Sequence, residues 1–196
     1  MFRLILATRN AHKAQEFAQI LGPNFELSDL TQFGNFPEVE EIGRTFEENA
    51  ILKALSASRC VDGLVVSDDS GLEVALLAGA PGVRSARYAG ESATDEENVA
   101  KVLAELRETG AATAKCAACF QCVLALAEAG KIVRTFHGTV RGSIVPTPRG
   151  ERGFGYDPIF VPEGYTQTFA ELGDAVKNRI SHRARALARL RESFVV

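Results

Sequence analysis

The stretch KCAACFQCVLALA (Lys115–Ala127), EAG (Glu128–Gly130) and KIVRTFHGTV (Lys131–Val140) decides the fold. Two long runs that suit buried strands flank a short turn ending in glycine, and this pattern is typical of a β-hairpin. Upstream, shorter apolar runs at Phe2–Ala7 and Leu64–Val66 alternate with helical patterns instead. Strand–helix alternation followed by a hairpin predicts an α/β (α+β) fold, with a mixed β-sheet flanked by helices.

Four helices are expected along the chain. The first covers Ala14–Leu21, and two more begin at Thr-x-x-Glu capping boxes, at Thr45 and at Thr94. Ser181 is suited to the N-cap of a last helix, whose inner face is apolar. No linker separates two independent parts, so we expect a single domain over residues 1–196.

Composition and charge exclude several classes of protein. The chain has 196 residues, of which 46% are hydrophobic and 24% charged, and its net charge is −3. These fractions exclude a disordered tail or a collagen-like repeat. The longest apolar run is far shorter than the roughly 20 residues of a membrane-spanning helix, and the first residues do not resemble a secretory signal. We expect a cytoplasmic protein without membrane or nucleic-acid partners, since a nucleic-acid binder needs a basic excess.

Cys116, Cys119 and Cys122 form a C-x-x-C-x-x-C pattern. Iron–sulfur and zinc sites use related spacings, but the fourth cysteine of the ferredoxin pattern is missing, and the next histidine is His137. Cysteine in an apolar stretch behaves as a small buried hydrophobic residue. We therefore expect a buried strand with reduced thiols.

Thr8, Asn10 and Lys13 lie where the first strand leads into the first helix. Backbone N–H groups at the start of a helix bind anions, and a lysine one turn later adds positive charge at the same point. The segment predicts a phosphate site without the glycine-rich sequence of a P-loop. An N-cap followed by a surface lysine would give the same pattern.

Asp68 and Asp69 are interpreted as the end of the strand that starts at Leu64, where ligands bind in open α/β sheets. Neighbouring residues of a strand point to opposite faces, so one carboxylate could bind Mg²⁺ while the other holds the loop. The acidic loop Glu38–Glu41 could complete the metal site. A polar turn before Gly71 and a solvated acidic surface are the alternatives.

The basic segment Lys177–Arg191 places His182 and Arg183 directly after the expected cap, Ser181. Cations at a helix N-terminus cost roughly 0.3–1 kcal/mol, so their presence there suggests a bound anion. Farther upstream, Gly153–Gly155 sets Phe154 between two glycines, where a base could stack on the ring. A solvated basic face and an ordinary glycine turn are the alternatives.

Six short motifs follow one another along the chain: Thr8-x-Asn10-x-x-Lys13, Thr45-Phe46-x-x-Asn49-Ala50, Asp68-Asp69-Ser70-Gly71-Leu72, Gly79-x-Pro81-Gly82, Gly153-Phe154-Gly155-Tyr156-Asp157-Pro158 and Ser181-His182-Arg183. In this order they resemble the inosine triphosphate pyrophosphatases, also called XTP/dITP diphosphatases. The resemblance extends from Leu4 to about Leu190. One departure is Arg9, where many relatives carry glycine.

The resemblance implies Mg²⁺-dependent hydrolysis of dITP, ITP and XTP to the monophosphate and pyrophosphate, which cleanses the nucleotide pool. It also implies an elongated mixed sheet with two lobes and a central cleft, and a homodimer. Asp69 is the implied proton acceptor, and Glu40 and Asp69 are the implied Mg²⁺ ligands, with Glu41 a rival for Glu40. The residues implied to bind the substrate are Thr8, Arg9, Asn10, Ala11, His12, Lys13, Lys53, Ser70, Phe154, Gly155, Tyr156, Asp157, Lys177, His182 and Arg183.

Two other functions stay open at the level of sequence. A related pyrophosphatase could act on modified pyrimidine nucleotides. A non-catalytic nucleotide or RNA binder could use the basic segment Lys177–Arg191, and salt-sensitive RNA affinity would mark it. The adjacent carboxylates of Asp68 and Asp69 favour an enzyme over a binder.

Overall fold

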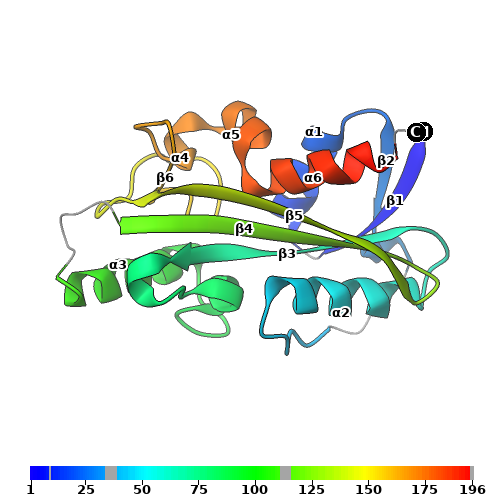
Figure 1. Cartoon of the computed structure of the whole chain (residues 1–196), viewed down its shortest axis with the longest axis horizontal. Helices are drawn as coiled ribbons and strands as arrows, with labels where there is room; N and C mark the ends of the chain where they lie inside the picture. The colour runs from blue at the N-terminus through cyan, green and yellow to red at the C-terminus, as the bar shows by residue number, and fades with distance from the viewer. Residues whose placement is uncertain (9, 34–38, 111–115, 195–196) are drawn as a thin grey trace. The chain divides into compact units, whose positions relative to one another are not determined.

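The computed structural model describes residues 1–8, 10–33, 39–110 and 116–194, and its centre is a six-stranded sheet of order β2-β1-β3-β4-β5-β6 (Figure 1). β1 runs parallel to β2 and β3, whereas β5 and β6 are antiparallel, so the expected mixed sheet is confirmed. The strands are β1 (Phe2–Ala7), β2 (Phe25–Asp29), β3 (Val65–Val74), β4 (Cys116–Glu128), β5 (Lys131–Ile144) and β6 (Phe160–Pro162).

Helices flank the sheet, and short 3₁₀ turns cover Leu30–Phe33, Ala75–Leu77 and Gly82–Arg87. The four expected helices are present, while α4 and α5, each under eight residues, were not predicted. The helices are α1 (Ala11–Leu21), α2 (Phe46–Ser58), α3 (Asp95–Glu108), α4 (Phe169–Leu172), α5 (Asp174–Ile180) and α6 (His182–Glu192).

The chain forms two compact units. Unit 1 comprises residues 1–69, 122–138 and 183–196, and unit 2 comprises residues 70–121 and 139–182. Strands β3, β4 and β5 each contribute residues to both units.

In unit 1, α1 and α6 lie on one face of the sheet and α2 lies on the other (Figure 1), and a hydrophobic cluster fills each side. Leu4, Leu6 and Val66 pack in one cluster with buried residues of α1 and α6. Ile5 and Val65, which alternate with them along the strands, pack in another cluster with α2. This burial of both faces explains why β1 and the start of β3 are almost uninterrupted apolar runs.

The core of unit 2 forms around α3, which begins at the predicted capping box. Thr94 accepts a hydrogen bond from the backbone N–H of Glu97, and the Glu97 side chain accepts one from the backbone N–H of Thr94. The predicted apolar face of this helix is buried and packs against Leu72, Phe120 and Phe160. Its members are Val99, Val102, Leu103 and Leu106.

The capping box predicted at Thr45 forms only in part. The Thr45 side chain accepts from the backbone N–H of Glu48 as expected, at 3.1 Å. The Glu48 carboxylate reaches one residue farther, however, and accepts from the backbone N–H of Arg44 at 2.6 Å. The helix therefore begins where the sequence predicts, and the Glu48 side chain links its first turn to the preceding segment by a hydrogen bond.

Strand β4 has two halves with different environments. From Cys116 to Gln121, buried residues alternate with more exposed ones, and from Cys122 to Ala127 every residue is buried. Cys119 points away from the face that holds Cys116 and Cys122, because successive strand residues face opposite sides. The C-x-x-C-x-x-C pattern lies in β4, as expected, with Cys116 and Cys122 buried and Cys119 half-buried, and all four cysteines of the chain are free thiols.

The prediction that Asp68 and Asp69 end a strand is wrong, because β3 continues to Val74. The strand that ends beside these residues is β1, the parallel neighbour of β3. β1 pairs with β3 only from Ile5 opposite Val65 to Ala7 opposite Ser67. The two carboxylates therefore follow the last residue at which β3 is paired with β1.

Candidate active site

Asp68 and Asp69 lie on opposite faces of β3. The partners of Asp68 come from α1, α6 and β4, the side on which Val66 is also buried. The partners of Asp69 come from α2, on the side where the Ser67 hydroxyl donates to the carbonyl of Ala50. The strand thus keeps the two adjacent negative charges apart.

Asp68 is held by two cations and a thiol. Its Oδ1 accepts from Lys13 Nζ at 2.5 Å, and its Oδ2 accepts from Arg183 Nε at 2.9 Å. The Cys122 thiol also donates to Oδ2, at 3.2 Å. Burial alone would raise the pKa of Asp68, but Arg183 and Lys13 outweigh it and hold the pKa well below the usual range.

Arg183 is itself buried and is shared between two carboxylates. Its Nη1 donates to Glu16 of α1, and its Nε donates to Asp68. Burial opposes the charged guanidinium, but Asp68 and then Glu16 outweigh burial and raise its pKa. Glu16, Arg183 and Asp68 therefore form one ion-paired chain that joins α1, α6 and β3.

Asp69 has a different set of partners. Its Oδ1 accepts from Lys53 Nζ at 2.9 Å, and its Oδ2 accepts from Asn49 Nδ2 at 3.3 Å. The same Lys53 ammonium donates to Glu41 Oε1 at 2.8 Å. Burial raises the pKa of Asp69, and the opposing effect of Lys53 and then Lys13 is too small to cancel it.

The start of α1 is a capped helix N-terminus. Asn10 is the N-cap, and its side chain accepts from the backbone N–H of Lys13 at 3.1 Å. The Thr8 hydroxyl accepts from the backbone N–H of Asn10 at 3.2 Å. Ala11 and His12 are exposed in the first turn, and Arg9 lies outside the described residues.

The acidic segment before α2 brings Glu41, rather than Glu40, to the carboxylates of the site. Glu40 is exposed, whereas Glu41 shares the Lys53 ammonium with Asp69. Among the described residues, no group of three or more His, Cys, Asp or Glu side chains gathers as a complete metal site. Two carboxylates around one cation nevertheless fit Mg²⁺, which commonly takes one or two protein carboxylates and fills its remaining positions with water and substrate phosphates.

A second group of predicted residues meets in unit 2. Asp157 Oδ2 accepts from Lys177 Nζ at 2.5 Å and from the backbone N–H of Phe154 at 3.0 Å. The Lys177 ammonium lies 4.2 Å from the centre of the Phe154 ring. An aromatic ring, a carboxylate and a cation are therefore gathered at one place, and both charged groups are buried.

Other predicted residues of unit 2 have structural partners. The Tyr156 hydroxyl donates to the carbonyl of Ser85 at 2.8 Å, and the ring is buried. The backbone N–H of Gly155 donates to Asp95 at 2.6 Å. The His182 ring stacks on Phe120 with 4.8 Å between ring centres.

The sequence placed Arg183 with Lys177 and His182, but the structure pairs it with Asp68 and Glu16. Ser70 follows Asp69 directly in β3 and is half-buried. The roles of Glu16 and Cys122 were missed, because their partners lie far away in the sequence. Asn49 stood in a recognised motif, but nothing in the sequence revealed which groups it touches.

Comparison with known proteins identifies the family of the chain. A model of the Ham1 family matches residues 4–193. The chain belongs to the Ham1 family. It is 47% identical to the dITP/XTP pyrophosphatase of Bacillus subtilis (strain 168), covering 97% of this chain and 96% of that one. It is 49% identical to the protein of the same name from Geobacter sulfurreducens, covering 98% and 96%.

Solved structures of Ham1 proteins have the same fold. A HAM1 protein from Coxiella burnetii superposes with a TM-score of 0.87 at 42% identity, covering 98% of each chain. A nucleoside-triphosphatase / dITP/XTP pyrophosphatase from Mycobacterium abscessus gives a TM-score of 0.76 at 40% identity, covering 96% of this chain and 98% of that one. The six-stranded mixed sheet is thus the Ham1 fold.

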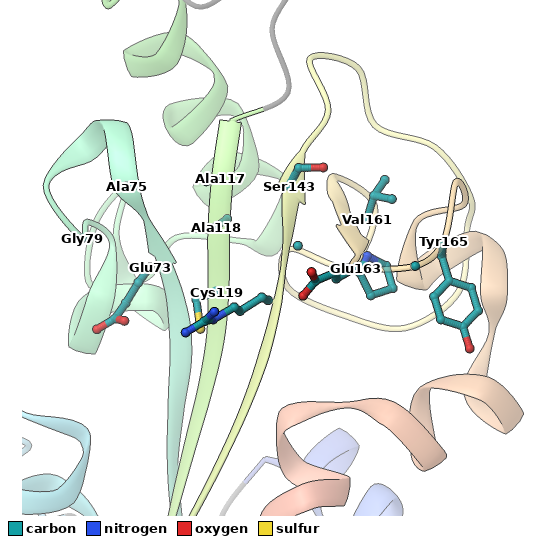
Figure 2. Close-up of a pocket in the computed structure, with 14 residues that line it drawn as sticks. Glu73, Ala75, Gly79, Ala117, Ala118, Cys119, Ser143, Val161, Glu163 and Tyr165 are labelled. Atoms are coloured by element: carbon teal, nitrogen blue, oxygen red, sulfur yellow. The ribbon is translucent and has the colours of Figure 1, made fainter.

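A hollow of about 660 Å³ lies on the sheet of unit 2, and it contains none of the residues that the family resemblance assigns to the site. Figure 2 shows Glu73 from β3, Cys119 from β4 and Glu163 after β6 along it. It coincides with the half of β4 in which residues alternate between buried and more exposed. The hollow is therefore an uncovered part of one sheet face.

Within the described residues, no helix is long and apolar enough to cross a bilayer.

Proposed function

We propose that this Ham1 protein hydrolyses dITP, ITP and XTP to the monophosphate and pyrophosphate, with residues 1–196 acting as one catalytic domain in the cytoplasm. Two relatives at 47% and 49% identity over nearly the whole chain are named dITP/XTP pyrophosphatases. The observation that carries the proposal is the carboxylate of Asp69, which lies between Lys53 and Asn49 and shares Lys53 with Glu41. Such a group of carboxylates and ammonium is suited to a metal-bound triphosphate.

The triphosphate would bind at the start of α1. Backbone N–H groups of residues 11 and 12 at the helix end favour negative charge, as do Lys13 and Lys53. Thr8, Arg9 and Asn10 complete this predicted phosphate segment, and Ser70 would contact the substrate beside Asp69. The ammonium groups of Lys13 and Lys53 stabilise the charge that develops on the phosphate oxygens as the bond breaks.

Asp69 would accept the proton of the attacking water, which adds to the α-phosphorus while pyrophosphate leaves. Mg²⁺, held by Asp69 with Glu41 or Glu40, would neutralise the phosphates and polarise the reacting phosphoryl group. Because Glu41 already shares Lys53 with Asp69, it is the better placed of the two glutamates. Asp68 keeps Lys13 in place and stays ionised.

Base recognition would use the group around Phe154 and Lys177. Hypoxanthine and xanthine carry an oxygen at position 6, where adenine carries an amino group. Hydrogen-bond donors such as Lys177 and His182 would favour the oxygen, and an adenine in the same place would leave a buried donor without a partner. Arg183 would act on the site indirectly, through its ion pair with Asp68.

The test is release of pyrophosphate by the purified protein from dITP, XTP, dATP, dGTP, dUTP and methylated pyrimidine nucleotides, with and without Mg²⁺. We expect turnover of dITP and XTP far above that of dATP, and only with Mg²⁺. Preferred turnover of pyrimidine nucleotides would replace the proposal with the pyrimidine alternative. Salt-sensitive RNA binding without pyrophosphate release would replace it with the binder alternative.

We also propose a homodimer, formed through the uncovered sheet face of unit 2. The face bears Glu73, Glu163 and Arg141, so a two-fold copy can set the arginine of one protomer against a glutamate of the other. We expect light scattering to give twice the chain mass and Arg141→Glu to shift the protein toward the monomer. A monomeric wild-type protein at micromolar concentration would contradict the homodimer and leave the proposed activity untouched.

A further inference from the structure

Asn49 is a fully buried polar side chain beside Asp69, and it makes two hydrogen bonds. Its Oδ1 accepts from the backbone N–H of Gly43 at 2.8 Å, and its Nδ2 donates to Asp69 Oδ2 at 3.3 Å. The family resemblance and the comparisons give no role to this residue. Its position links the proposed proton acceptor to the segment that carries Glu41.

The direction of the Asn49 amide is determined by its partners. A backbone N–H can only donate, so the atom that faces Gly43 must be the amide oxygen. The amide nitrogen must then face Asp69, whose ionised carboxylate can only accept. Asn49 therefore presents a fixed donor to Asp69.

Asn49 and Lys53 act together because they are four residues apart on α2 and so lie on one face of the helix. Each donates to a different oxygen of Asp69, and this fixes the plane of the carboxylate. Each is also tied to the segment before α2, Lys53 through Glu41 and Asn49 through Gly43. The same two side chains thus locate both Asp69 and Glu41.

Gly43 has no room for a side chain. A Cβ built on it would lie 2.5 Å from Asn49 Oδ1 and 2.7 Å from the Cβ of Glu48. Any larger residue must therefore push the segment away from α2 or break the hydrogen bond to Asn49. The contact with Glu48 shows in addition that the segment lies close against the first turn of α2.

We propose that Asn49 and Gly43 form a positioning pair that fixes Asp69 and the Glu41 segment, and so sets how tightly the site binds its divalent metal. The inference rests on the proposed function, since it assigns the pair to that metal site. Neither residue touches the substrate in this proposal. Both act through the carboxylates that they orient.

The chain contains a matched control in Asn98. Asn49 and Asn98 both stand four residues after a threonine N-cap, in α2 and α3, and both are buried. The amide of Asn98 bonds two backbone groups, the carbonyl of Ala86 at 3.2 Å and the N–H of Ala89 at 2.8 Å. It therefore ties a loop to its helix, as Asn49 does, but orients no carboxylate.

The experiment compares Asn49→Ala, Gly43→Ala and Asn98→Ala with the wild type. For each protein we measure melting temperature, kcat and KM for dITP, and the Mg²⁺ concentration that gives half-maximal activity. Mutation of a residue that orients a metal ligand typically lowers metal affinity or activity by roughly 10–100-fold. We expect such a loss in kcat and Mg²⁺ affinity for Asn49→Ala and Gly43→Ala, with KM nearly constant, and only a lower melting temperature for Asn98→Ala.

A direct binding measurement removes the dependence on turnover. Mn²⁺ is titrated against each protein in the presence of α,β-methylene-ITP, and unbound Mn²⁺ is followed by electron paramagnetic resonance. We expect weaker Mn²⁺ binding to Asn49→Ala and Gly43→Ala than to the wild type and Asn98→Ala. Asn49→Asp keeps the acceptor for Gly43 but repels Asp69, and we expect this variant to bind Mn²⁺ more weakly than the wild type as well.

The outcomes separate the positioning pair from the proposed function. If the wild-type protein releases no pyrophosphate, the proposed function fails, and the Mn²⁺ titration still decides the pair. If Asn49→Ala and Asn98→Ala lower the melting temperature by the same amount and neither changes metal binding, Asn49 and Gly43 have only a structural role and the inference is wrong. Because the two residues share one hydrogen bond, the Gly43→Ala/Asn49→Ala double variant should lose less than the sum of the single losses.

Discussion

On the α1 and α6 side of β3, Asp68 is fully buried and carries three donors, whereas on the α2 side Asp69 carries an ammonium and a neutral amide. The two residues have the same side chain and adjacent positions. Their pKa values nevertheless shift in opposite directions. Burial raises that of Asp69, and at Asp68 the cations Arg183 and Lys13 reverse the same effect.

This difference shows how one strand can give two adjacent carboxylates different tasks. A carboxylate that must stay ionised needs strong cations that it does not release, and Asp68 has them in Arg183 and Lys13. A carboxylate that accepts a proton has to be less firmly held by cations, and Asp69, the proposed proton acceptor, accepts from one ammonium and a neutral amide. We therefore expect substitutions at Asp69 to affect chemistry and substitutions at Asp68 to affect stability.

Asp69→Asn should give the largest effect. A positioned general base contributes about 10²–10⁴-fold to a rate, and the amide cannot accept the proton. We expect dITP turnover to fall by that factor or more, measured as pyrophosphate release at saturating Mg²⁺. The melting temperature should change little, because the site disfavours the charge of Asp69. A folded Asp69→Asn protein with near-wild-type turnover would contradict the assignment.

Asp68→Asn should give the largest loss of stability. Removing one partner of a buried ion pair costs on the order of 3–5 kcal/mol, because the other charge is left buried. Arg183 would lose its ion pair with Asp68 and keep the one with Glu16. We expect urea unfolding to show a loss near the lower end of that range, and Arg183→Ala to be comparably unstable. Equal stability of the Asp68→Asn and Asp69→Asn proteins would remove the distinction between the two faces.

The pH dependence of stability should separate the same two variants. Because its folded-state pKa is depressed, Asp68 contributes stability that is fully present above its unfolded pKa of about 3.9. That contribution is lost as the pH falls through the folded value. We expect the gap in unfolding free energy between wild type and Asp68→Asn to be constant from pH 5 to pH 7 and to shrink below about pH 4. A gap that is unchanged at pH 3 would show that Asp68 acts through packing rather than charge.

Cys122 should give the smallest effect. Burial raises the pKa of its thiol well above the usual range, and the charge of Asp68 adds to this, so it stays a neutral donor. Cys122→Ser keeps a donor, and Cys122→Ala removes it, which costs about 0.5–1.5 kcal/mol for a single hydrogen bond plus the lost packing. We expect the alanine variant to be the less stable in urea unfolding. The reverse order would mean that the apolar character of the thiol matters more than its hydrogen bond.

Local patterns predicted those parts of the fold that neighbouring residues determine. The hairpin forms where Glu128–Gly130 predicted it, and α3 begins at the capping box of Thr94. The end of β3 was predicted wrongly, because Asp68-Asp69-Ser70-Gly71 has the composition of a turn. Within the strand, cations from helices distant in the sequence pair with the two carboxylates, and a local pattern cannot contain that information.

The site was predictable in its residue types and less so in its pairings. Lys13 pairs with Asp68 and Lys53 pairs with Asp69, so these two lysines lie beside the carboxylates of one of the motifs that carry the resemblance. The ion pair of Arg183 with Glu16 joins residues 167 positions apart, and no spacing rule connects such residues. The donor that Asn49 gives to Asp69 likewise depends on how α2 packs on β3, which the sequence does not display.

The hairpin turn offers a practical way to study unstable active-site variants. Ala129 has φ of 48° and Gly130 has φ of 73°, the left-handed region that both central residues of a type I′ turn require. Alanine in this conformation costs roughly 1–2 kcal/mol, which asparagine largely avoids. Ala129→Asn should therefore raise the stability of the protein without changing the proposed active site. In this more stable background, a destabilised Asp68 variant could be purified and assayed.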